Sequence, residues 1–100
     1  MSIENLVGLS VVDNVMYQQY REKMLPLLKE YGGGFGYDFK VSEVLKSEDG
    51  NHNINRVFTI YFKDEQSMKS FFSNPLYLDI RKKYFDSSVQ SSTIIARYEK

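Results

Sequence analysis

The chain has 100 residues, enough for one domain over residues 1–100, and its 13 acidic and 13 basic side chains cancel, which argues against nucleic-acid binding. It contains no cysteine, so disulfides, thiolate nucleophiles and zinc–thiolate sites are excluded, and a cytoplasmic location is predicted. No apolar run approaches the roughly 20 residues of a membrane helix, and the first residues lack the basic region and apolar run of a signal peptide. The eight Tyr and seven Phe predict half-buried aromatic surfaces.

The first part of the chain predicts a strand followed by a long helix. Residues 6–12 are rich in Val and Leu and predict a strand that ends at Asp13-Asn14, and either of these side chains can cap a helix. The helix is predicted to continue, with a bend, through Pro26 until Gly32 ends it. Its buried side recurs at helical spacing and comprises Tyr17, Tyr20, Met24, Leu27, Leu28 and Tyr31.

Two further strands, joined by a polar turn, follow the glycine run. Residues 35–41 alternate apolar with polar side chains, which predicts a strand whose aromatic face carries Phe35, Tyr37 and Phe39. The turn over residues 47–53 contains Asp49-Gly50, a hairpin signal. Residues 56–62 give the clearest strand, with Phe58, Ile60 and Phe62 on one side and Val57, Thr59 and Tyr61 on the other.

The last part of the chain predicts two short helices and a final strand. Asp64 is placed to cap the first helix, which carries Met68, Phe71 and Phe72. Asn74-Pro75 begins the second, whose buried stripe is Leu76, Tyr77, Ile80 and Tyr84. Residues 92–98 predict a strand in which Ile94, Ala96 and Tyr98 alternate against Thr93, Ile95 and Arg97.

The order β-α-β-β-α-α-β predicts an α+β fold of the ferredoxin-like, split βαβ type. Right-handed crossovers then place the helices on one face of a four-stranded antiparallel sheet. Because the predicted strands carry apolar side chains on both faces, the face away from the helices would expose more apolar surface than a monomer usually tolerates. The sequence therefore predicts a homodimer formed through this sheet face.

Several segments, in the same order along the chain, resemble a family of small bacterial proteins. They are Asp13…Tyr17-x-x-Tyr20, Pro26…Tyr31-Gly32-Gly33-x-Phe35, Arg56-Val57 and Phe72-x-x-Pro75-x-Tyr77-x-x-x-Arg81. The family is a domain-of-unknown-function group in the dimeric α/β-barrel superfamily, whose relatives by fold include antibiotic-biosynthesis monooxygenases, muconolactone isomerase and NIPSNAP-like proteins. The resemblance implies a homodimer whose two sheets form a barrel-like core, and it implies no particular reaction.

One group of tyrosines and arginines forms a candidate ligand site. Tyr17 and Tyr20 share one helix face, and Tyr77 and Arg81 share another. In a cleft between helices and sheet, tyrosine hydroxyls and a guanidinium would fix a carboxylate or carbonyl group. The alternative is that these tyrosines only pack in the core and the interface. The full candidate set is Tyr17, Tyr20, Tyr37, Arg56, Tyr77 and Arg81.

Two functions remain open at this point. The first is a binding module, a dimer that holds a small aromatic or carboxylated metabolite. The second is a cofactor-independent oxygenase or isomerase, in which Tyr20 or Tyr77 donates to a developing oxyanion and Arg81 supplies positive charge. A buried acid or base in the cleft would favour the enzyme, and Asp38 and His52 are the groups to inspect.

No cofactor or metal site is predicted from the remaining motifs. The run Gly32–Gly36 closes a helix and opens a strand, which is the opposite polarity to a phosphate-binding loop. The only histidine, His52, lies in a predicted surface turn, and no calcium-loop spacing is present.

Overall fold

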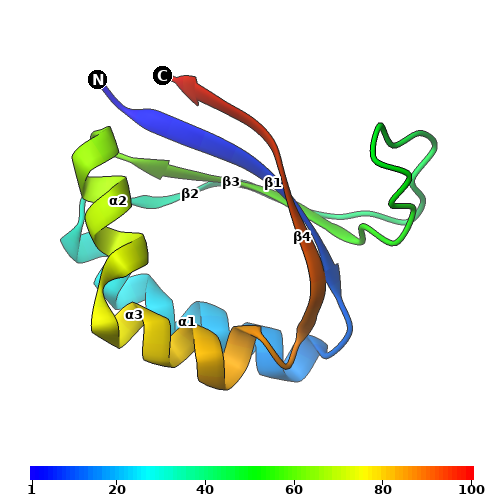
Figure 1. Cartoon of the computed structure of the whole chain (residues 1–100), viewed down its shortest axis with the longest axis horizontal. Coiled ribbons are helices and arrows are strands. Elements are labelled where there is room, and N and C mark those ends of the chain that lie inside the picture. The colour runs from blue at the N-terminus through cyan, green and yellow to red at the C-terminus, as the bar shows by residue number, and fades with distance from the viewer.

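The computed structural model describes all 100 residues, and in it a four-stranded antiparallel sheet carries every helix on one of its faces (Figure 1). The strands lie in the order β2-β3-β1-β4, so β2 and β4 are the edges. The chain runs through β1 (Ile3–Val11), α1 (Asn14–Glu30), β2 (Gly34–Lys40), β3 (Arg56–Phe62), α2 (Glu65–Ser73), α3 (Pro75–Ile80), the π-helical turn η1 (Arg81–Phe85) and β4 (Val89–Glu99). This is the predicted α+β, ferredoxin-like fold.

The helices begin where the sequence places capping side chains. The Asp13 carboxylate accepts the Met16 backbone N–H at 3.0 Å, and Asp64 accepts that of Ser67 at 2.7 Å. Asn74 caps α3 in the same way, with Pro75 as the first helical residue. As predicted, α1 continues through the single proline inside it. None of the helices has the length and apolar character needed to span a membrane.

The core lies between the helices and the sheet face that they cover. Phe58, Ile60 and Phe62 of β3 alternate as predicted, and the structure shows that this set is the one buried on the helix side, against the buried face of α1. The buried residues of α1 are Tyr17, Tyr20, Met24 and Leu28. In α3 only Tyr77 is fully buried, whereas Leu76, predicted to be buried, is 64% exposed. The prediction for Leu76 was wrong because α3 is a single short helix that presents one face to the core.

A bulge in β4 changes the side to which its last residues point. Val7 lies opposite Ile94, but Leu6 lies opposite Ala96, so Ile95 is an extra residue in the ladder. Beyond the bulge, Arg97 lies opposite Asn5 and faces the helices. The strict alternation predicted for this strand was therefore wrong after Ile94.

A second irregularity has the same effect on β2. Phe35 lies opposite Ile60 and Asp38 lies opposite Phe58, so two residues of β2 lie across from one of β3. Phe35 and Asp38 consequently face the helices. Tyr37 is turned to the other side, where its ring stacks on that of Phe39 with centroids 5.8 Å apart. The single aromatic face predicted for this strand was wrong for the same reason.

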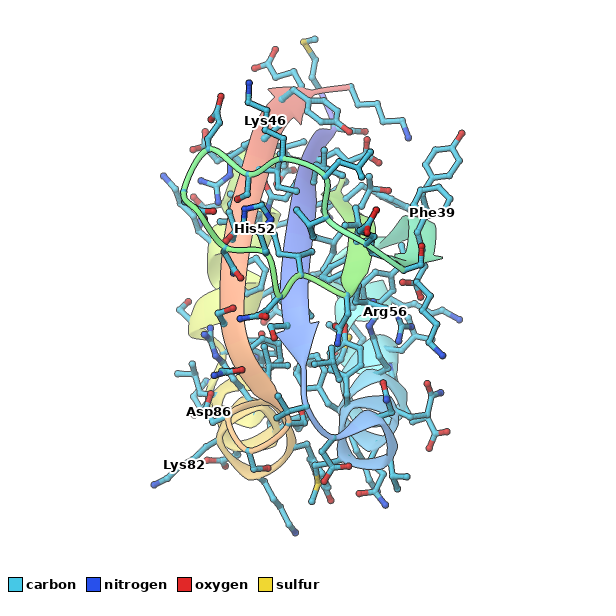
Figure 2. All side chains as sticks on the ribbon, turned by 90° about the vertical axis from the view of Figure 1, so that its right-hand side faces the viewer. Phe39, Lys46, His52, Arg56, Lys82 and Asp86 are labelled. Atoms are coloured by element: carbon cyan, nitrogen blue, oxygen red, sulfur yellow. The ribbon has the colours of Figure 1, made fainter.

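The sheet face away from the helices, called here the outer face, is partly covered by residues 41–55. Figure 2 shows this segment crossing in front of β1 and β4, with His52 on it. Ile54 packs where β1 has Gly8, since a Cβ at that position would lie 3.2 Å from the Ile54 side chain. The uncovered remainder of the outer face carries Leu6, Tyr37, Phe39, Val57, Tyr61, Ile95, Ala96 and Tyr98.

Candidate ligand-binding cleft

A cleft of about 240 Å³ lies between the helix-covered face of the sheet and the helices, and 17 residues line it. Twelve of them are hydrophobic, most with aromatic rings, from β1, β2, β3, β4, α1, α2, α3 and η1. The remaining five are Asn5, Arg21, Arg81, Ser92 and Arg97. The lining thus contains three arginines and no Asp, Glu, Lys or His, an arrangement that favours an anion with an apolar body.

The cleft opens along the edge of β4. Ile94 points toward the helices, opposite Val7, yet 56% of its surface is exposed. No strand lies beyond β4, so this side is bounded only by α2, α3 and η1. The opening between the edge of β4 and the helices that face it is called the mouth, and Arg81 of η1 and Arg97 of β4 line the cleft from the helix side and the sheet side.

Two tyrosine hydroxyls meet in the cleft. Tyr20 of α1 and Tyr77 of α3 are 5% and 2% exposed, and their hydroxyl oxygens lie 2.9 Å apart. Burial raises the pKa of Tyr20 well above its ordinary value, and burial also raises the pKa of Tyr77. Both side chains are therefore neutral and act as hydrogen-bond donors and acceptors.

Asp38 of the edge strand β2 lies beside the cleft, held between two arginines. Arg56 donates to its two carboxylate oxygens at 2.8 and 2.7 Å, and Arg21 approaches it at 3.3 Å. The hydrogen bond from Arg56 and the charge of Arg21 hold the pKa of Asp38 below its usual range. Arg21 also donates to the Tyr17 hydroxyl at 2.7 Å and lies 3.9 Å from the centre of the Phe35 ring. Asp38 thus stays ionised and neutralises part of the positive charge of Arg21 and Arg56.

The two arginines on either side of the mouth have different partners. The Arg81 Nε lies 3.7 Å from the Asp86 carboxylate in an exposed ion pair, and its guanidinium lies 5.1 Å from the centre of the Phe85 ring. The Arg97 Nε donates to the Asn5 side-chain oxygen at 2.7 Å, and Arg97 forms no ion pair. The mouth therefore carries net positive charge.

The structure brings four of the six predicted site residues together. Tyr17, Tyr20, Tyr77 and Arg81 all line the cleft. Tyr37 does not, because the β2 irregularity turns it to the outer face, where it is 64% exposed. Arg56 does not line the cleft either, and it lines a separate hollow together with Arg21 and Asp38. Their roles in binding remain predictions.

The only histidine has no place in this cleft. His52 is exposed on the segment over the outer face, and its Nδ1 lies 3.4 Å from the Val44 carbonyl oxygen (Figure 2). No group of three or more His, Asp or Glu side chains lies together to bind a metal ion.

Comparison with protein families gives a match over residues 6–98 to the model described as "Domain of unknown function (DUF1330)". The chain belongs to the DUF1330 family. This agrees with the resemblance in its tyrosine, glycine and proline motifs. No curated protein matches the DUF1330 chain.

Solved structures similar to this DUF1330 chain share its fold at low identity. A protein of unknown function from Rhodopseudomonas palustris has a TM-score of 0.78 and 16% identity, over 99% of this chain and 82% of that one. A dabb family protein with a ferredoxin-like fold from Mesorhizobium loti has a TM-score of 0.67 and 12% identity, over 99% and 96%. A dimeric ferredoxin-like protein of unknown function from Jannaschia sp. CCS1 has a TM-score of 0.60 and 14% identity, over 100% of both chains.

Four polar residues of the cleft, Asn5, Arg21, Ser92 and Arg97, were missed by sequence reasoning. Arg21 was within reach, because it lies one helical turn after Tyr17 on the predicted helix. Asn5 preceded the predicted first strand, which in fact begins at Ile3. Arg97 was predicted to point to the side opposite Ile94, and the bulge at Ile95 instead places both side chains on the helix side.

Proposed function

We propose that this DUF1330 chain binds a small carboxylated molecule with an aromatic or other apolar body, one in each subunit of a homodimer. The observation that carries the proposal is the lining of the cleft: aromatic and aliphatic walls with three arginines and no acidic side chain. An apolar body gains from leaving water, and a carboxylate gains charge-assisted hydrogen bonds from guanidinium groups.

The size of the cleft limits the ligand. Its volume of about 240 Å³ is below that of pockets for drug-sized molecules, which span about 300–1,000 Å³. An apolar cavity of about 150 Å³ is sufficient for benzene. One ring with a short acid side chain therefore suits this cleft.

The charge of the ligand follows from which arginines are already neutralised. Arg21 lies against Asp38, which it shares with Arg56. Arg81 has only a long, exposed contact with Asp86, and Arg97 has no carboxylate partner. A single negative charge on the ligand would balance the excess positive charge at the mouth, so that no unpaired ion is buried.

The same lining favours binding over proton-transfer catalysis. A general base must reach its substrate in a deprotonated form, and the cleft contains no carboxylate or imidazole. Its buried tyrosines, Tyr20 and Tyr77, have raised pKa values and stay protonated near neutral pH. The alternative of an oxygenase or isomerase therefore has no proton acceptor in the cleft.

The outer face supports the homodimer. Tyr37, Phe39, Ile95 and Tyr98 expose between 64% and 40% of their surfaces on this face. Ferredoxin-like proteins from Jannaschia and from Bacteroides fragilis, with TM-scores of 0.60 and 0.61, are described as dimeric. A second copy of this chain, whose matching face is equally apolar, is the occupant that we propose.

Ligand binding is tested by thermal unfolding with phenylacetate and benzoate. Both are expected to raise the Tm of the wild-type chain. Ile94→Trp fills the mouth and should abolish the shift. Leu78→Trp is the matched control, because Leu78 is also partly exposed, at 47%, and lies outside the cleft. A Tm shift that persists in Ile94→Trp, or no Tm shift with the wild type, would show that these acids do not bind in the cleft.

The dimer is tested separately by sedimentation velocity. Tyr37→Glu puts a charge on the outer face and should convert the dimer into a monomer. Leu76→Glu is the control, since Leu76 is also 64% exposed but lies on α3, on the helix side. A wild-type chain that sediments as a monomer at micromolar concentration would contradict the proposed homodimer but not the proposed ligand binding, which thermal unfolding tests separately.

A further inference from the structure

Arg97 reaches the cleft because of a single inserted residue. In β4 the extra residue Ile95 shifts the alternation by one position, so that Arg97 points to the helix side, directly opposite Asn5 of β1. A β-bulge beside a binding site commonly re-aims one side chain in this way. The neighbour Tyr98 is turned to the outer face, where it donates to Glu4.

Asn5 holds the near end of the Arg97 guanidinium. The Asn5 side chain is 2% exposed, and its oxygen accepts the Arg97 Nε–H at 2.7 Å. Its amide nitrogen lies 3.6 Å from the Met68 sulfur of α2, which fixes the amide from the other side. Because the Nε is engaged, the two terminal nitrogens of Arg97 are left as a free, planar pair of donors.

No carboxylate of the chain occupies that pair of donors. Glu4 lies on the opposite face of the sheet, where Tyr98 and Lys100 contact it. Glu99, which lies opposite Ile3 on the same side as Arg97, forms no ion pair with it. Arg97 is therefore a positioned cation on the cleft wall without a partner in the protein.

We propose that Arg97, positioned by Asn5, is the anchor that binds the ligand's carboxylate, and that it binds both carboxylate oxygens at once. This rests on the proposed function, since it assumes that the cleft binds a small acid. A guanidinium whose Nε is already bonded offers two parallel N–H groups, which match the two oxygens of a carboxylate. The carboxylate then lies at the wall formed by β4, and the apolar body points inward toward Phe58 and Ile60.

The inference is tested by the affinities of phenylacetate and its neutral analogue phenylacetamide, measured by titration calorimetry. Arg97→Met is expected to weaken phenylacetate binding by about 10- to 100-fold, the usual value of charged hydrogen bonds, and to leave phenylacetamide unchanged. Arg97→Lys keeps the charge but loses the planar fork, so it should recover only part of the affinity. Lys82→Met is the control, because it removes one charge from an exposed side chain that points out from the molecule (Figure 2) and does not line the cleft.

Asn5→Asp provides a second variant that keeps the shape of the side chain. Its new carboxylate would bind Arg97 internally, so phenylacetate should bind roughly tenfold more weakly. Unchanged phenylacetate affinity in both Arg97→Met and Asn5→Asp would overturn the anchor while leaving the proposed function intact. Full affinity in Arg97→Lys would overturn the inference that the guanidinium binds both carboxylate oxygens at once. A wild-type chain that binds neither probe would overturn the proposed function itself, and the anchor with it.

Discussion

The hydroxyl groups of Tyr20 and Tyr77 lie 2.9 Å apart and join α1 to α3 through a buried hydrogen bond in the cleft. The Tyr20 ring also packs against Phe85 of η1, with centroids 5.0 Å apart. Through these two contacts Tyr20 connects α1 to α3 and to η1, the segment that carries Arg81. Tyr20 therefore fixes the position of α3 and η1 relative to α1 on the helix side of the cleft.

Replacing Tyr20 with Phe should lower the free energy of unfolding by about 1 kcal/mol, because the buried Tyr77 hydroxyl loses its partner. Urea unfolding measures this change. Tyr37→Phe is the control, since the Tyr37 side chain is 64% exposed and its hydroxyl has no hydrogen-bond partner in the chain. Equal stability of Tyr20→Phe and the wild type would show that the hydroxyl pair contributes nothing.

The ion pair of Asp38 predicts a loss of stability in acid. Arg56 and Arg21 lower the pKa of Asp38 in the folded chain. Its contribution to stability is therefore complete above about pH 3.9, the ordinary aspartate value, and is lost as the pH falls through the lower folded pKa. Asp38→Asn should destabilise the chain at about pH 7 and much less at about pH 2–3.

Urea unfolding at the two pH values checks this prediction. Asp79→Asn is the control, because Asp79 is exposed and forms no ion pair. A difference between wild type and Asp38→Asn that stays the same in acid would mean that the two arginines do not stabilise the carboxylate.

The turn between α1 and β2 predicts a strict requirement for glycine. A Cβ on Gly33 would lie 2.8 Å from the Tyr61 carbonyl oxygen and 2.5 Å from a Leu28 methyl carbon, and a backbone atom has little freedom to move away. Gly33→Ala should therefore lower the free energy of unfolding by about 1–3 kcal/mol. Gly50→Ala has no atom within 4 Å, so its smaller cost comes only from its φ of +76°. A smaller loss for Gly33→Ala than for Gly50→Ala in urea unfolding would contradict the close packing.

Asn55 ties the start of β3 to the end of β1. Its side-chain oxygen accepts the Val11 backbone N–H, and its amide donates to the Val11 carbonyl, both at 2.9 Å. Asn55→Ala should cost about 1–3 kcal/mol, since both backbone groups lose a partner. Asn53→Ala, at an exposed position whose side chain makes no hydrogen bond, should change the melting temperature little. Equal melting temperatures for the two variants would refute the tie.

Most of the fold could be predicted from local physical chemistry. Asp64 and Asn74 were identified as helix caps, and Asp13 was one of two candidates with Asn14, because such side chains accept a backbone N–H in the first turn. The alternation in β3 correctly grouped Phe58, Ile60 and Phe62 on one side, although it did not show which side faces the helices. These signals depend on residues close together in the sequence, so they survive without knowledge of the tertiary structure.

The candidate site could be predicted only in part, because two strand irregularities decide its polar groups. The sequence carries no local mark of the shift between Phe35 and Asp38, which exposes Tyr37, or of the extra residue Ile95, which brings in Arg97. A bulge depends on how two strands fit against each other and against the core, and each one reverses the side to which every later residue points.

The most direct test of the central claim is a series of ¹⁵N–¹H correlation spectra recorded while phenylacetate is added. The account predicts that the shifted amide signals belong to residues around the cleft, such as Tyr20, Arg81, Ile94 and Arg97. Spectra that do not change, or changes confined to outer-face residues such as Tyr61 and Ala96, would contradict it.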